Sequence, residues 1–334
     1  MGSGDRPDTV TIHQVAKAAR VSPATVSRVM NRRQSVDPEL ARRVQQVAAS
    51  LGYQPNAVAR GLARGRTGVI AVIVPDLGNP MFQSVLRGVS RAAGNEDYRV
   101  LVTDSHEFPL EETLLSWETR LRADGLVLCA PRTHDQELLG IAGKLEPFVL
   151  VNRHVDGMNV PTVSVDYASG VRAVVAHLAW LGHTRAAYLS GPVASTSNQE
   201  RLESLHEATH ERMTLDVIEC GSMHEDGYEA ADRALATGAT AVIGYNDVVA
   251  LGALGKLHEI GVAVPNDISV VGFDDIPFAR YCAPRLTTVS VPQEELGLQA
   301  WNRLSALLHD HALPADVCFT PRLEVRGSTG PVAR

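Results

Sequence analysis

The segment from Thr11 to Ala63 constrains the fold most strongly, because it is a compact basic block at the head of a longer acidic chain. Thr11 followed by Gln14 predicts a capping box, in which each side chain satisfies a free backbone N–H at the start of a helix. Ser22 is a good N-cap for a second helix, and Pro23 suits the first position of that helix. Two short helices separated by a tight turn are typical of a helix-turn-helix, whose second helix fits the major groove of DNA.

The second predicted helix is expected to turn a polar, cationic face outward. Val26 and Val29 recur at helical spacing and are expected to point into a small core. Thr25 and Arg28 are the expected readers of base edges, since Arg28 can grip guanine through O6 and N7, whereas the Ala24 methyl can meet a thymine methyl but cannot hydrogen-bond a base. A plain phosphate contact is the alternative for Arg28. The predicted DNA contacts of this region are Thr11, Ser22, Pro23, Ala24, Thr25, Ser27, Arg28 and Asn31.

A third helix is predicted to complete the small core. Asp37 can cap it, Pro38 can begin it, and Gly52 stands at its expected end. Its apolar stripe consists of Leu40, Val44, Val47 and Leu51. Farther along, Asn56 can cap a last short helix that runs to Ala63, but a glycine within about two turns makes this helix marginal in isolation. We expect it to fold only when it is pressed against another surface.

The charge is divided unevenly between the two parts of the chain. Residues 1–66 hold 11 Lys and Arg against 4 Asp and Glu, a net charge of +7; the remainder holds 20 against 34, a net charge of −14, and together these give the net −7 of the 334-residue chain. A basic head on an acidic body fits a phosphate-binding module fused to a module that does not touch nucleic acid. Ordinary scatter of surface charge is the alternative.

Cysteine usage and the absence of targeting signals indicate where the protein acts. The 4 cysteines lie far apart without metal-binding spacing, which is typical of thiols in a reducing cytosol. The first ten residues lack the apolar core of a signal peptide, and no apolar run is long enough to cross a bilayer. We therefore expect a soluble cytoplasmic protein with no cofactor and no bound metal.

From Val69 onward, buried apolar runs alternate with amphipathic helical stretches. The predicted strands are Gly68–Asp76, Val100–Asp104, Gly125–Ala130, Phe148–Asn152, Thr162–Asp166, Ala186–Gly191, Leu215–Cys220, Thr240–Tyr245 and Ile268–Asp275. This alternation predicts an α/β fold of parallel sheets covered by helices on both faces. Because Thr162–Asp166 resembles a crossing point between two such series, we expect two doubly wound lobes. Ligands of such sheets bind at the carboxyl ends of the strands, where this chain carries polar residues, although Asp and Asn can also serve there as plain helix caps.

The stretches TIHQVAKAARVSPATVSRVMN, LGYQPNAVARGLA and VVGFDD together resemble the lactose-repressor (LacI/GalR) family of bacterial transcription regulators, over about Thr9 to Thr329. The resemblance implies a DNA-binding domain at 9–55, a hinge helix and linker at 56–66, and an effector-binding and dimerisation domain at 67–330. It implies an N-lobe of about 67–165 plus 293–320 and a C-lobe of about 166–292 plus 321–330, like the lobes of periplasmic sugar-binding proteins. In the hinge it implies DNA contacts by Asn56, Ala59, Arg60 and Leu62. Leu62 would wedge into the minor groove and kink the duplex.

The same resemblance implies an effector site in a cleft between the lobes. The residues that match this site are Phe82, Asn152, Arg153, Ser195, Ser197, Arg201, Met223, Asn246 and Asp274. Phe82 would stack on a ring, while Met223 falls where an aromatic residue often closes the pocket. The expected effector is a small sugar that releases a repressor from a palindromic operator, and a nucleobase or nucleoside, acting as inducer or co-repressor, is the alternative. Because a two-fold operator needs a two-fold protein, we expect a homodimer that associates with the nucleoid when it binds an operator.

Other functional classes fit the sequence less well. The chain has no GxxxxGK[ST] phosphate loop, no GxGxxG after a strand and no GxSxG elbow, so we do not expect an enzyme. His206 and His210 have the i, i+4 spacing of some zinc ligands, but they lack an HExxH motif and an obvious third ligand. A secreted sugar-binding protein would share the lobes, but it would have a signal peptide and no helix-turn-helix.

Overall fold

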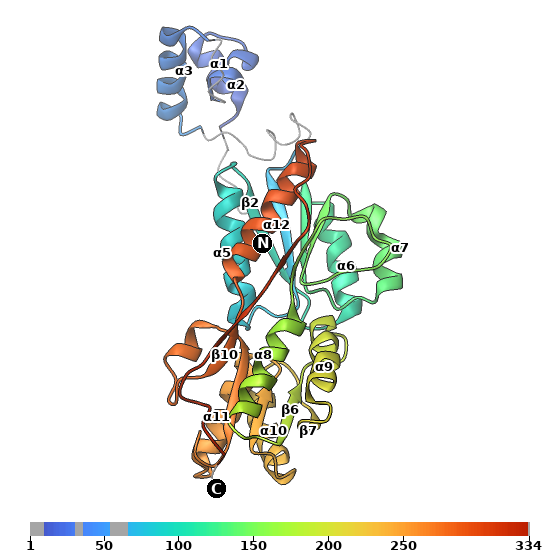
Figure 1. Ribbon diagram of the computed structural model, residues 1–334. Helices are drawn as coiled ribbons and strands as arrows, with labels where there is room; N and C mark the ends of the chain where they lie inside the picture. Colours follow the sequence, from blue (N-terminus) through green and yellow to red (C-terminus); the bar gives the residue numbers. More distant parts are fainter. Residues whose placement is uncertain (1–9, 31–35, 54–65, 333–334) are drawn as a thin grey trace, which may run out of the picture. The chain divides into compact units, whose positions relative to one another are not determined.

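The computed structural model describes residues 10–30, 36–53 and 66–332, and the chain divides into two compact units, Met1–Thr67 and Gly68–Arg334. The described part of the first unit contains three helices, α1 (Ile12–Ala19), α2 (Pro23–Met30) and α3 (Pro38–Ser50) (Figure 1). They share a core whose buried residues are Val15, Ala16, Ala19, Val26, Val29, Val44 and Ala48. This is the small three-helix core that the sequence predicts.

The helices of the first unit begin at the predicted caps. Thr11 and Gln14 form the capping box, with the Thr11 N–H donating to Gln14 Oε1 over 2.7 Å. The Asp37 carboxylate accepts from the N–H groups of the two residues that follow Pro38, over 3.0 and 2.9 Å. The prediction for Leu51 is wrong, because α3 ends at Ser50 and leaves this side chain 39% exposed. Tyr53 packs against the core instead, after the chain turns at Gly52.

The second unit contains two six-stranded sheets, which define its N-lobe and its C-lobe. The N-lobe sheet has the order β11-β5-β4-β3-β1-β2, and its neighbouring strands are parallel. Its strands are β1 (Val69–Val74), β2 (Arg99–Asp104), β3 (Gly125–Cys129), β4 (Phe148–Val151), β5 (Thr162–Val165) and β11 (Val317–Phe319). Its helices are α5 (Pro80–Gly94), α6 (Pro109–Arg120), α7 (Asp135–Leu145) and α12 (Gln293–Leu308). The helices α5 and α12 cover one face of this sheet, and α6 and α7 cover the other.

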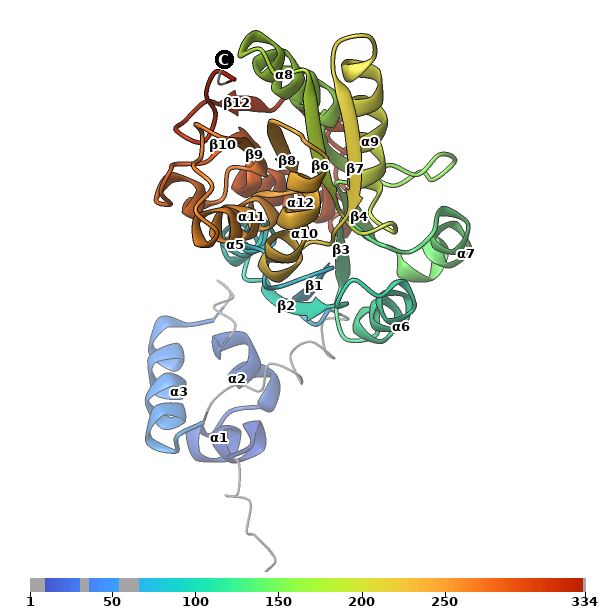
Figure 2. The ribbon, with the colours of Figure 1, turned by 90° about the horizontal axis from the view of Figure 1, so that it is seen from below.

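The C-lobe sheet has the order β12-β10-β9-β8-β6-β7, in which β12 alone is antiparallel to its neighbour. Its strands are β6 (Arg185–Ser190), β7 (Thr214–Glu219), β8 (Ala241–Gly244), β9 (Ser269–Asp274), β10 (Thr287–Ser290) and β12 (Arg322–Glu324). Its helices are α8 (Tyr167–Trp180), α9 (Thr196–Thr209), α10 (His224–Ala236) and α11 (Asp247–Glu259), with a short 3-10 turn η1 (Pro277–Arg280). As Figure 2 shows, α8 and α9 lie on one face of the sheet and α10 and α11 on the other.

The predicted α/β fold class with two doubly wound lobes is confirmed, and each predicted apolar run coincides with a strand of one of the sheets to within one or two residues at each end. The sequence analysis did not find β10, β11 and β12, which are only 4, 3 and 3 residues long. These short strands attach the chain to each sheet near its crossings between the lobes. The chain crosses after β5, again between β10 and α12, and finally between β11 and β12.

The first turn of α12 lies directly against α5 in the N-lobe. A Cβ atom on Gly88 would lie 2.1 Å from the Glu294 carbonyl oxygen, and one on Gly297 would lie 2.1 Å from the Val85 carbonyl oxygen. The two backbones therefore touch at both points, and no larger residue fits there. No helix in the described ranges is long and apolar enough to cross a membrane.

Candidate functional site

The second helix of the first unit carries the predicted DNA-reading residues. The Ser22 hydroxyl accepts from the Thr25 N–H over 3.1 Å, which fixes the start of α2. Ala24 and Arg28 are exposed, and Arg28 Nε donates to the Ala24 carbonyl over 3.4 Å, so both lie on the outer face. Thr11 and Ser22 are also exposed, whereas Pro23, Thr25 and Ser27 are partly exposed. The predicted contacts Asn31, Asn56, Ala59, Arg60 and Leu62, and the hinge helix with them, lie outside the described residues.

A small cavity lies between the carboxyl ends of strands from both lobes. The predicted effector residues that line it are Phe82, Asn152, Ser197, Arg201, Asn246 and Asp274. The other residues that line it, which are not among the predicted effector residues, are Asn79, Met81, Ala130, Tyr167 and Tyr245. Tyr245 follows directly after β8, and Tyr167 begins α8 two residues after the end of β5, so an aromatic residue close to a strand end was the available signal.

Arg201 and Asp274 form the charged centre of this cavity, and each is only 4% exposed. The Arg201 guanidinium lies 3.8 Å from the ring centroid of Phe273 and 4.5 Å from that of Tyr167, so aromatic faces stabilise its charge. Its Nη1 donates to the Tyr245 carbonyl. Burial raises the pKa of Asp274 to about 6, and the Arg201 charge counters part of that rise.

Several groups around the cavity remain available to a ligand. Asn152 Oδ1 and Arg201 Nε are buried and have no hydrogen-bond partner in the described part of the chain. Among the same residues, nothing donates a hydrogen bond to the Asp274 carboxylate. Asn152 and Asp274 also have positive φ angles of 54° and 110°, which are strained for residues other than glycine. Unpaired polar atoms on strained strand ends are expected where a ligand completes the hydrogen bonding.

Ser195 and Asn246 serve mainly as helix caps. Ser195 is fully buried behind the cavity wall, where its hydroxyl accepts from the Asn198 N–H over 3.3 Å and shares a 2.9 Å hydrogen bond with the Tyr245 hydroxyl. Asn246 does line the cavity, but its Oδ1 accepts from the Val249 N–H over 2.8 Å and its Nδ2 donates to a backbone carbonyl. These two side chains therefore act as helix caps, which is the alternative role that the sequence left open for polar residues at strand ends.

Arg153 and Met223 lie outside the cavity lining. Arg153 Nη2 donates to Asp135 over 2.7 Å and to the Thr133 carbonyl over 3.1 Å, so its charge is paired within the N-lobe. Met223 precedes α10 and approaches the loop after β1, because a Cβ atom on Gly78 would lie 3.2 Å from the Met223 methyl carbon. Met223 thus meets the N-lobe next to Asn79, a residue that lines the cavity, without being part of the lining itself.

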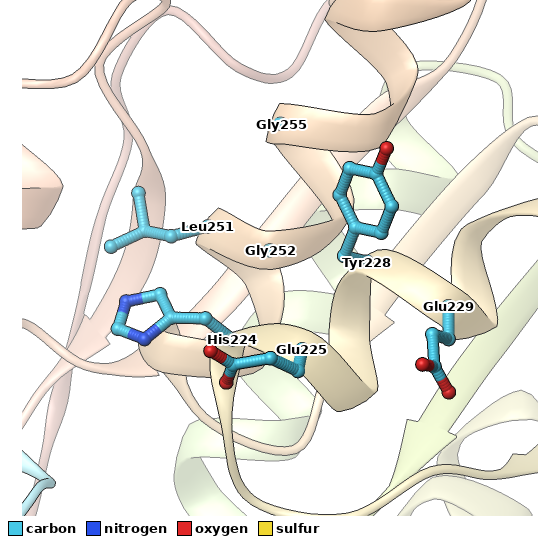
Figure 3. Close-up of a pocket in the computed structure, with 7 residues that line it drawn as sticks. All are labelled: His224, Glu225, Tyr228, Glu229, Leu251, Gly252 and Gly255. Atoms are coloured by element: carbon cyan, nitrogen blue, oxygen red, sulfur yellow. The ribbon is translucent and has the colours of Figure 1, made fainter.

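A second, wider groove of about 360 Å³ lies on the C-lobe between α10 and α11 (Figure 3). A Cβ atom on Gly252 would lie 1.9 Å from the His224 carbonyl oxygen, so the two helix backbones touch along its floor. The Tyr228 hydroxyl on its wall already donates to Glu259. None of the buried side-chain atoms that lack a partner in the described residues belongs to this groove, which therefore lacks the features of an effector site.

Comparisons with known proteins were consistent across the chain. The profile of bacterial regulatory proteins of the lacI family matches residues 11–56, and that of the periplasmic binding protein-like domain matches residues 175–329. The HTH-type transcriptional repressor CytR of Escherichia coli K12 is 31% identical over 335 residues, which is 96% of each chain. The crystal structure of the lac repressor dimer bound to operator and the anti-inducer ONPF has a TM-score of 0.87 and 27% identity, over 97% of this chain and 100% of that one. A LacI family regulator from Enterococcus faecium with bound ribose has a TM-score of 0.69 and 26% identity, over 79% of this chain and 100% of that one.

Proposed function

This chain belongs to the LacI family of bacterial regulatory proteins, and on that basis we propose that it is a DNA-binding transcriptional repressor controlled by a small sugar. The observation that carries this proposal is the combination, in one chain, of an exposed helix-turn-helix surface on α2 with a polar cavity between two lobes. Because members of the family are regulators, the proposal assigns no catalytic residue. The protein acts in the cytoplasm on duplex operator DNA.

The free hydrogen-bonding groups of the cavity favour a sugar as effector. The Asp274 carboxylate can accept from two adjacent hydroxyls, and the unpaired Nε of Arg201 can donate to a hydroxyl or ring oxygen. The unpaired Oδ1 of Asn152 can accept a further hydroxyl from the N-lobe side. The Phe82 ring, which lines the same cavity, offers an apolar face for a sugar ring. A ligand that satisfies groups of both lobes at once favours their closed arrangement.

The helix α6, which buries polar residues and exposes apolar ones, supports the proposal that the protein acts as a homodimer. The residues Glu112, Ser116 and Thr119 form the buried face of α6, while its apolar residues face outward. The exposed fractions are 70% for Leu110, 57% for Leu114, 45% for Trp117 and 70% for Leu121, the residue that caps the end of α6. Leu101 and Val102 of β2 are each 38% exposed as well. An apolar stripe that turns away from its own core marks a protein contact, and we assign it to a second copy of this chain, as the lac repressor relative is a dimer.

Ligand-dependent melting of the full chain tests the effector class. D-ribose, D-galactose and cytidine are each added in excess, and a ligand of the native state raises the melting temperature in proportion to the logarithm of its concentration over Kd. A rise with a free sugar supports the proposal. A rise with cytidine alone would show that the effector is a nucleoside and not a sugar, and the proposal that the protein is a regulator would still stand.

A further inference from the structure

Gln293 is the first residue of α12 and stands where the chain returns from the C-lobe sheet to the N-lobe. Its side chain is 8% exposed, and its Nε2 donates to the backbone carbonyl of Asp274. Three residues earlier, Ser290 is the register partner of Asp274 between β10 and β9. The crossing segment therefore lies beside Asp274 at one end and donates a hydrogen bond to its carbonyl at the other.

The conformation of Asp274 needs such an attachment. A φ of 110° is strained for an aspartate and persists where the surroundings hold it. The neighbouring Asp275 also has a positive φ, but its carboxylate is fixed within the C-lobe by Arg326 over 2.6 Å and by Arg280 over 2.8 Å. The Asp274 carboxylate instead lines the cavity, where Arg201 Nη2 lies 3.6 Å away without a hydrogen bond, and the Asp274 carbonyl accepts from the Gln293 amide.

The residue that follows Gln293 is tied to the other lobe. The Glu294 carboxylate pairs with Arg87 over 3.2 Å and with Arg91 over 3.3 Å, and both arginines belong to α5. The same helix begins beside the cavity, where Phe82 forms part of the opposite wall. Adjacent residues of α12 thus hold Asp274 of the C-lobe and the helix that bears the N-lobe wall.

We propose that Gln293 is a positioning residue, whose amide holds the Asp274 peptide in its left-handed conformation and keeps the carboxylate directed into the cavity. This inference rests on the effector site proposed above and deepens it. Because Gln293 belongs to α12, the position of the Asp274 carboxylate depends on the position of α12 relative to the C-lobe. An effector that displaces Asp274 therefore also displaces α12. A neutral donor of this length is required, because a carboxylate at 293 would repel the carbonyl and an apolar side chain would leave it unpaired.

Crystal structures of full-length variants test the positioning role directly. Gln293→Leu removes the donor, and Gln293→Asn keeps an amide that is too short to reach the Asp274 carbonyl. If the leucine variant does not fold, the asparagine variant alone tests the positioning role. Gln299→Leu on the same helix is the matched control, because the Gln299 amide donates to Glu295 and accepts from Arg303 over 2.9 Å, and both partners lie within α12. We expect both changes at 293 to move Asp274 out of positive φ, or to turn its carboxylate away from Arg201, and the control to leave it in place. An unchanged Asp274 in the variants at 293 would overturn the proposal.

Titration calorimetry with D-ribose measures how the same variants change effector affinity. We expect the changes at 293 to weaken binding by 10-fold or more, while Gln299→Leu binds like the unmodified protein and all variants retain operator binding without ligand. Unchanged ribose affinity in both variants at 293 would contradict the positioning role. If the unmodified protein binds neither ribose nor the other probes, the sugar proposal fails, whereas the crystal structures still decide the role of Gln293.

Discussion

Arg201 Nη2 and Asp274 Oδ1 lie 3.6 Å apart, so these two buried, oppositely charged groups attract each other without sharing a hydrogen bond. Their attraction is strong because both side chains are buried, yet the hydrogen-bonding capacity of the carboxylate stays unused. A ligand with two adjacent hydroxyls can take up that capacity without breaking a contact already made. The pair is therefore arranged to receive a polar molecule, in contrast to the saturated carboxylate of Asp275 beside it.

Replacing Asp274 with alanine should abolish the response to the effector and leave operator binding intact. The change removes the acceptor of two hydroxyls, so effector affinity should fall by roughly 100-fold, or about 2–3 kcal/mol. Titration of operator release by the effector measures this. Asp216→Ala on the outer strand β7, which breaks a surface pair with Arg185 of β6, is the matched control and should respond normally. A normal response by the Asp274 variant would remove this residue from the site.

Effector affinity should depend on pH through Asp274. Its pKa is raised to about 6 by burial, so the carboxyl is ionised at pH 7.5 and mostly protonated at pH 5. Because two hydroxyls require the ionised form, affinity should fall about 10-fold for each pH unit below 6. Calorimetric titrations at pH 5 and 7.5 measure this change, and Asp274→Asn should bind weakly and with little dependence on pH over the same range. A ratio near one for the unmodified protein would show that Asp274 does not receive the ligand.

The same raised pKa has a defined consequence for stability. A carboxyl whose pKa is higher in the folded than in the unfolded state stabilises the fold fully below its unfolded pKa, and this contribution is lost as pH rises through about 6. In the absence of ligand, Asp274→Asn should therefore lose little stability at pH 5 and gain stability relative to the unmodified protein at pH 8. Denaturant unfolding at both pH values measures the difference. If the difference in unfolding free energy between the variant and the unmodified protein is the same at both pH values, the raised pKa of Asp274 is contradicted.

Arg28 should contribute to sequence recognition as well as to affinity. If Arg28 reads guanine, Arg28→Ala should cost about 1–3 kcal/mol on the specific operator and relax the preference at one base pair. Binding selections from random duplexes, followed by gel retardation, measure both effects. Arg42→Ala, an exposed arginine on α3, is the control and should not change the preferred sequence. Equal losses on specific and random DNA would show that Arg28 contacts a phosphate.

The exposed stripe of α6 should hold the dimer together. Leu114→Asp places a charge in the middle of the proposed contact, so the protein should become monomeric and bind a two-fold operator weakly. Because Leu114 is 57% exposed, the fold of each lobe should tolerate the change. Light scattering measures the mass. Leu139→Asp on α7, at a position 41% exposed, is the matched control and should remain a dimer. A dimeric Leu114 variant would place the contact elsewhere.

The sequence by itself determined the starts of the helices of the first unit and the strands β1 to β9 of the second. Caps such as Thr11 with Gln14, or Asp37 before Pro38, act between residues two or three positions apart, so the local sequence suffices. Buried parallel strands are likewise visible as long apolar runs. Leu51 was misplaced because a periodic pattern does not reveal where the next residues fold back.

Only the tertiary structure decided which polar residues at the strand ends face the cavity. Ser195 and Ser197 are two positions apart, yet one is a buried cap and the other lines the cavity, because α9 begins between them. Arg153 is paired with Asp135, the first residue of α7, and no sequence spacing predicts that pairing. The hydrogen bond from Gln293 to Asp274 joins residues that are 19 positions apart and belong to different lobes. The sequence thus determined what each strand end carries, whereas the packing of the lobes determined which groups are left without a protein partner and so are free to bind a ligand.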